Sequence, residues 1–114
     1  MISVKSNTDL EKLRAAGRIA GRALKLAGES VRAGMTTKEL DKIVHDYIVS
    51  CGATPSFLGY GGFKGSACIS INNEVIHGIP SSKRKIADGD IVSVDVGAYY
   101  NGFHGDTCAT FAVG

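Results

Sequence analysis

The sequence predicts one α+β domain in which two helices precede an antiparallel sheet. Two observations carry this prediction. Apolar residues recur every three or four positions in the first half of the chain, and they alternate with polar residues near its end. The length of 114 residues suits a single domain. Helices followed by a run of strands are typical of the α+β class.

The composition is that of a folded globular domain, with 44% hydrophobic and 21% charged residues. The net charge of +2 is too small to indicate a nucleic acid or an anionic membrane as partner. No apolar run approaches the roughly 20 residues of a membrane-spanning helix. The N-terminus also lacks the apolar stretch of a signal peptide. The three cysteines have no CxxC spacing, so we expect reduced thiols and a cytoplasmic protein.

A first helix is expected from about Thr8 to Arg32. Thr8 and Glu11 have the spacing of a capping box, which satisfies free N–H groups at a helix start. The apolar stripe is rich in alanine, so the element packed against it should approach closely. Glycines within the helix weaken it but permit close packing. The stripe comprises Leu13, Ala16, Ala20, Ala23, Leu24, Ala27 and Val31, and the glycines are Gly17, Gly21 and Gly28.

A second helix is expected soon after Gly34. Thr36 and Glu39 repeat the capping-box spacing, and Gly52 occupies the place of a left-handed C-terminal stop. His45 lies on this helix, where a histidine is more often a surface or packing residue. The apolar face comprises Leu40, Ile43, Val44, Tyr47, Ile48 and Cys51.

An irregular, glycine-rich stretch over residues 53–65 carries the aromatic residues Phe57, Tyr60 and Phe63. Aromatic side chains on such a loop could form the wall of an apolar ligand pocket. They could instead fill the core of the domain itself, and the loop alone favours this second interpretation.

Strands are expected at 66–71, 75–79, 91–98 and 103–113, the last two forming a hairpin. Because side chains alternate along a strand, Asp95 and Asp106 lie on one face of this hairpin. A turn centred between Tyr100 and Asn101 pairs the two aspartates directly. A turn centred on residues 101–102 pairs Asp106 with Gly97 and leaves Asp95 a diagonal neighbour. In either register the carboxylates lie within about 8 Å of each other.

Two carboxylates on one face repel each other, and three arrangements relieve the repulsion. The pair can share a proton, each aspartate can have its own donors, or a divalent cation can sit between them. The pattern leaves both a metal site and two structural aspartates open. His77 could project into a cleft or be a structural histidine. His104 shares a face with Asp106 and could be a ligand, a donor to a ligand or an exposed bystander, and the pattern favours the bystander.

Two long stretches resemble type I methionine aminopeptidases: LGYGGFKGSACISINNEVIHGIP at 58–80 and DGDIVSVDVGAYYNGFHGDTCATFAVG at 88–114. The resemblance implies one half of the pita-bread fold, which surrounds a dinuclear metal centre. It implies that Asp95 chelates one metal and that Asp106 bridges both. It also implies a substrate site formed by His77, which contacts the peptide and helps the transition state, and by a methionine pocket comprising Tyr60, Phe63, Phe57 and Cys68.

The same resemblance implies divalent Mn, Co, Fe, Zn or Mg ions, two in a complete site, and removal of methionine from N-terminal methionyl peptides. The family's histidine and two glutamate ligands belong to a second half that these 114 residues do not include. We therefore expect little or no activity of this chain alone. The expected partner is the second half-domain or a second copy, a homodimer that brings two aspartate pairs together. Four carboxylates would favour Mn²⁺ or Mg²⁺ over zinc.

Two other functions compete with this expectation. A half-pita-bread chain could be a non-catalytic homodimer or peptide-binding scaffold, although a scaffold has no need of two like charges on one face. A prolidase-like peptidase is the third possibility, and the HGIP and GFHGD segments fit it less well.

Overall fold

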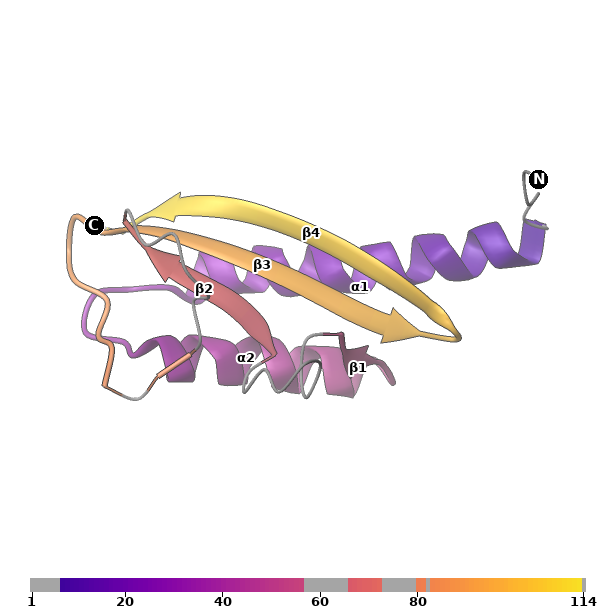
Figure 1. Ribbon diagram of the computed structural model, residues 1–114, viewed down its shortest axis with the longest axis horizontal. Coiled ribbons are helices and arrows are strands. Elements are labelled where there is room, and N and C mark those ends of the chain that lie inside the picture. The colour runs from indigo at the N-terminus through magenta and orange to yellow at the C-terminus, as the bar shows by residue number, and fades with distance from the viewer. Residues whose placement is uncertain (1–6, 57–65, 73–79, 82, 114) are drawn as a thin grey trace.

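The computed structural model describes residues 7–56, 66–72, 80–81 and 83–113. The two helices pack against one face of a four-stranded antiparallel sheet (Figure 1). The predicted fold class, with helices before strands, is confirmed. No helix in the described part of the chain has the length and apolar character needed to cross a membrane. The elements are α1 (Asn7–Ser30), α2 (Thr37–Ser50), β1 (Thr54–Pro55), β2 (Ala67–Ile71), β3 (Ile91–Tyr100) and β4 (Phe103–Ala112).

Helix α1 packs through the alanine-rich stripe that the sequence predicted. Its alanines are fully buried, whereas Leu13 and Val31 at the ends of the stripe are only half-buried. The helix begins at Asn7, so Thr8 lies inside the first turn and is not the N-cap that its spacing to Glu11 had indicated. The expected and observed ends of a helix commonly differ by a residue or two, because the terminal turns lack a full set of hydrogen bonds.

Helix α2 begins and ends where its sequence signals placed it. Thr36 is the N-cap: its Oγ1 accepts a hydrogen bond from the Glu39 N–H at 3.1 Å, and Glu39 Oε1 accepts one from the Thr36 N–H at 3.1 Å. Gly52 follows the helix with a φ of 77°, in the left-handed region. Leu40, Val44 and Ile48 of the predicted apolar face are buried, and so is Thr37, which the prediction did not include.

Strand β3 is the centre of the sheet. One of its edges pairs with β4 along the whole hairpin, and the other pairs with β2 and then with β1. The short strand β1 falls inside the stretch that the sequence had indicated as irregular. Ser56, directly after β1, donates its N–H to the Gly97 carbonyl at 2.9 Å, and Ala67 stands opposite Val96. The chain therefore leaves the edge of β3 at Ser56 and returns to it one position further along.

Some residues with predicted roles lie outside the described residues. These are Phe57, Tyr60 and Phe63, within 57–65, and His77, within the strand expected at 75–79. The flanking positions Ser56, Ser66, Asn72 and Pro80 belong to the described part of the chain.

The closest approach between helix and sheet occurs where α1 crosses β4. A Cβ added at Gly105 would collide with the backbone of Ala16 and Gly17, and one added at Gly28 would collide with the Phe111 ring. By contrast, Gly17 and Gly21 have no neighbour within 4 Å of such a Cβ. The sequence correctly predicted close packing, but of the three helix glycines only Gly28 permits it.

Candidate metal centre

The face of the sheet turned away from the helices carries the polar residues of the hairpin. Along β3, Val92, Val94 and Val96 are buried against the helices, so Asp95 points to the opposite face. Residues on that same face from the neighbouring strands are Cys68 on β2 and His104, Asp106 and Cys108 on β4.

The hairpin turn selects between the two registers that the sequence left open. Asn101 and Gly102 both have positive φ, 51° and 89°, as the two central residues of a tight hairpin turn require. This turn pairs Gly97 with Asp106 and Asp95 with Cys108. Asp95 and Asp106 are thus diagonal neighbours on one face.

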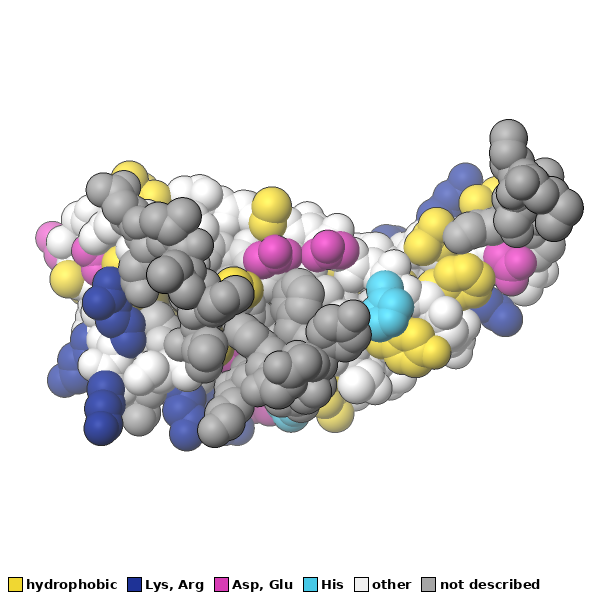
Figure 2. All heavy atoms as spheres, in the orientation of Figure 1, with side chains coloured by type: hydrophobic (Ala, Val, Ile, Leu, Met, Phe, Trp, Pro, Cys, Tyr) yellow, Lys and Arg dark blue, Asp and Glu magenta, His cyan; other side chains and the backbone are white. Residues whose placement is uncertain are grey.

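The two carboxyl groups interact directly. Burial raises the pKa of Asp95 above its ordinary value, and a hydrogen bond to Asp106 and the charge of that carboxylate raise it further. Asp95 is half-buried and Asp106 is exposed. Two acidic side chains adjoin each other over the strands of the open face in Figure 2. A divalent cation held between the two carboxylates would relieve this repulsion.

Asp95 and Asp106 supply some, but not all, of the ligands that a hard divalent cation needs. Two adjacent carboxylates offer the oxygen ligands that Mn²⁺ and Mg²⁺ prefer and can bridge two ions. Within the described ranges, no third His, Cys, Asp or Glu joins the pair in a group able to hold a metal. Asp95 and Asp106 would therefore supply two ligands, and the others would come from elsewhere.

Cysteines flank Asp95 on both sides. Cys68 stands directly opposite it on β2, and Cys108 stands directly opposite it on β4. The half-buried Cys68 and the exposed Cys108 are both reduced. They line a shallow groove that includes Asp95 and continues along Ser70, Ser93 and Thr110.

His104 is exposed, and two neighbouring side chains contact its ring. Its Nδ1 lies 2.9 Å from Ser56 Oγ, and its ring lies against Tyr99 with centroids 4.5 Å apart. Ser56 directly precedes residues 57–65, so His104 links β4 to the position where the chain leaves the sheet. Pattern alone could not find this contact, because its partners are 48 residues apart.

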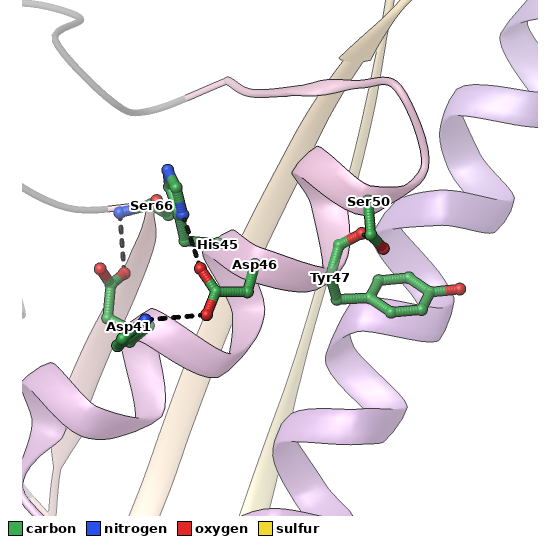
Figure 3. Close-up of polar contacts among 7 residues, drawn as sticks. Asp41, His45, Asp46, Tyr47, Ser50 and Ser66 are labelled. Carbon is green, nitrogen blue, oxygen red and sulfur yellow. Dashed lines mark hydrogen bonds and ion pairs between the residues drawn. The ribbon is translucent and has the colours of Figure 1, made fainter.

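Sequence reasoning missed Asp41, a residue on α2. Its Oδ1 accepts hydrogen bonds from the Ser66 and Ala67 N–H groups, each at 2.7 Å (Figure 3). Burial raises the pKa of Asp41 even though both hydrogen bonds act to lower it. His45, one turn further on, contacts the exposed Asp46 at 3.2 Å, in agreement with the surface role expected for it. No local signal marks Asp41, because its partners follow it by 25 and 26 residues.

The raised pKa of Asp95 predicts how stability depends on pH in the presence of EDTA. At pH values between 3.8, the ordinary pKa of an aspartate, and the raised pKa of Asp95, the folded chain binds more protons than the unfolded chain. Stability conferred by this pair therefore falls as pH rises through that window. We expect Asp95→Asn to resist urea increasingly better than the unmodified chain as pH rises. Urea midpoints from about pH 4 to about pH 8 measure this, and a difference independent of pH would contradict it.

Comparison with known proteins shows the family to which the chain belongs. The model of metallopeptidase family M24 matches residues 11–114. The methionine aminopeptidase of Clostridium acetobutylicum is 50% identical over 114 residues, which are all of this chain and 46% of that protein. The crystal structure of methionine aminopeptidase from Rickettsia prowazekii superposes with a TM-score of 0.93 at 40% identity, covering 100% of this chain and 46% of that one.

A prolidase from Pyrococcus furiosus also superposes, with a TM-score of 0.79 at 27% identity over 97% of this chain and 31% of that one. Both figures are lower than those for the Rickettsia structure. The chain spans about half the length of the methionine aminopeptidases it matches. Two helices followed by an antiparallel sheet constitute one half of the pita-bread fold, and the chain belongs to metallopeptidase family M24.

Proposed function

We propose that this chain supplies one half of a methionine aminopeptidase site, with Asp95 and Asp106 as its metal ligands. The observation that carries the proposal is the contact between these carboxyl groups on the open face of the sheet. The likeness to methionine aminopeptidases over the whole chain supports the choice of substrate. N-terminal methionyl peptides are the proposed substrates, and the cytoplasm is the proposed location.

The roles of the residues follow from their positions. Asp95 and Asp106 would hold divalent ions of Mn, Co, Fe, Zn or Mg. Such ions, when bound, polarise a scissile carbonyl and lower the pKa of water. Cys68 adjoins Asp95, and the chain leaves the edge of β3 at Ser56, beside Gly97, and pairs with it again at Ala67, opposite Val96. The likeness to methionine aminopeptidases supports a methionine pocket comprising Cys68, Phe57, Tyr60 and Phe63, with His77 contacting the peptide.

The remaining ligands would come from a complementary half, either a second half-domain or a second copy of this chain. The open face supports such a partner, because Ile91 and Tyr99 at the two ends of β3 are 49% and 41% exposed on it. In a homodimer, a twofold axis would bring two Asp95–Asp106 pairs together around the ions. Sedimentation of the chain with and without Mn²⁺ distinguishes the homodimer from a chain that needs a different half.

Release of methionine from the peptide Met-Ala-Ser tests the proposed function. We expect release by the concentrated chain to require Mn²⁺ and to fall at least roughly tenfold in Asp106→Asn, because that variant lacks one of the two carboxylates that would hold the ion. Asp46→Asn is the matched control, since Asp46 is an exposed aspartate whose contacts are to Lys42 and His45. Equal release by Asp106→Asn and the unmodified chain would contradict the proposal. Peptide binding without release would favour the scaffold instead.

A further inference from the structure

The first residues of β2 are held by a side chain from α2. Asp41 Oδ1 accepts the N–H groups of Ser66 and Ala67 at 2.7 Å, and these two residues are 1% and 0% exposed. Water therefore does not reach them, and a buried amide needs a partner. In Figure 3 the carboxylate of Asp41 points from the helix toward the backbone of Ser66. One carboxylate oxygen thus satisfies two neighbouring buried amides.

This contact acts one residue away from the candidate metal centre. Cys68 follows Ala67 directly and stands opposite Asp95. Because strand side chains alternate, a slip of one residue would turn Cys68 toward the helices. The hydrogen bonds to Asp41 therefore fix which residue of β2 adjoins the metal ligands.

The two ends of β2 are fixed independently. At the far end, the Asn72 N–H donates to the Ile91 carbonyl at 2.7 Å, and Asn72 Oδ1 accepts the Ile91 N–H at 2.9 Å. Helix α2 is held by Leu40 and Val44, which are fully buried in the core. Loss of the Asp41 carboxylate should release the near end of β2 and leave its far end and the helix in place.

We propose that Asp41 is a positioning residue for the first side chain of the bound peptide: through Ser66 and Ala67 it fixes Cys68 beside Asp95. Burial raises the pKa of this carboxyl, and the hydrogen bonds from Ser66 and Ala67 act against that rise. The consequence for the peptide rests on the proposed function, whereas the anchoring of Cys68 does not.

Thiol reactivity tests the anchoring without any substrate. The rate of alkylation by iodoacetamide is measured separately at Cys68 and Cys108 by mass spectrometry. We expect Asp41→Ala to raise the rate at Cys68 about fivefold or more, because local opening controls access to a half-buried group. Cys108 is the internal control. It also stands opposite Asp95, but it lies on β4, whereas the hydrogen bonds of Asp41 hold the start of β2.

Two further variants keep this experiment decisive. Asp41→Asn retains a neutral oxygen acceptor, so we expect it to give an alkylation rate at Cys68 between those of the unmodified chain and Asp41→Ala. If Asp41→Ala fails to fold, Asp41→Asn takes its place in the experiment. Asp46→Ala removes an exposed carboxylate from the same helix and should change neither rate. Rates that rise together at Cys68 and Cys108, or an unchanged rate at Cys68, would overturn the anchoring.

Substrate selectivity tests the consequence for the peptide. We expect the ratio of kcat/KM for Met-Ala-Ser to that for Leu-Ala-Ser to fall about fivefold in Asp41→Asn, because a displaced pocket wall discriminates less between side chains. A purely structural role would lower both kcat/KM values equally and leave the ratio unchanged, which would overturn the positioning role. An unmodified chain that releases no methionine would contradict the homodimeric form of the proposed function, and the alkylation rates would still decide the anchoring.

Discussion

Replacing Gly105 by alanine is expected to lower the free energy of unfolding by about 3 kcal/mol, at the upper end of the usual cost of overpacking. The added Cβ would collide with the backbone of Ala16 and Gly17, which cannot rotate away as a side chain can. Helix α1 and strand β4 would have to separate along their crossing. Thermal unfolding followed by circular dichroism should show a fall in Tm of roughly 15 °C.

Glycines of α1 provide the matched controls. Gly21→Ala meets nothing within 4 Å and replaces a helical glycine, so it should stabilise the chain by up to roughly 1 kcal/mol. Gly28→Ala should lie between the two, because its obstacle is the ring of the half-buried Phe111, which can shift. A Gly105→Ala chain that unfolds at the same temperature as the unmodified one would show that α1 does not pack against β4 in this way.

Affinity for Mn²⁺ should fall roughly a hundredfold in either Asp95→Asn or Asp106→Asn, which corresponds to about 2.8 kcal/mol of binding free energy. Each substitution removes one of the two adjoining carboxylates and leaves an amide, a neutral and weaker ligand. Isothermal titration measures the affinity directly. A rise in Tm with added Mn²⁺ provides an independent measure, because an ion that binds the folded chain stabilises it by mass action.

The exposed Asp46 again serves as the control for this metal experiment, and Asp46→Asn should retain the affinity of the unmodified chain. If Asp46→Asn weakened Mn²⁺ binding as much as Asp106→Asn did, general loss of negative charge would explain the result. Undiminished binding in both Asp95→Asn and Asp106→Asn would place the metal site elsewhere.

The features that the sequence predicted correctly depend on neighbours along the chain. The capping box of Thr36 and Glu39 spans one helical turn, and the placement of Asp95 and Asp106 on one face follows from strand alternation and a short turn. The choice of register needed the backbone angles of Asn101 and Gly102. Strand alternation alone allowed two hairpin registers, and the structure shows which of them forms.

The features that the sequence did not predict depend on contacts between distant segments. Asp41 lies on the polar side of α2, where an aspartate is ordinarily a solvated charge, and only the folding of β2 against the helix gives it its partners. The contact between His104 and Ser56 is also between distant segments. It forms because the two-residue strand β1 brings Ser56 to the sheet. Neither contact leaves a periodicity or a spacing that could have been recognised beforehand.

Ser56 and Ala67 meet adjacent positions of β3, so the segment between them begins and ends at one place on the sheet. Its two ends meet whatever lies between them, and the entropic cost of closing a loop grows slowly with its length. Insertions or exchanges within this segment would therefore leave the pairing of β3, and with it the spacing of Asp95 and Asp106, unchanged. On the proposed function, recognition of the peptide side chain would be free to diversify while β3 and β4 keep one geometry.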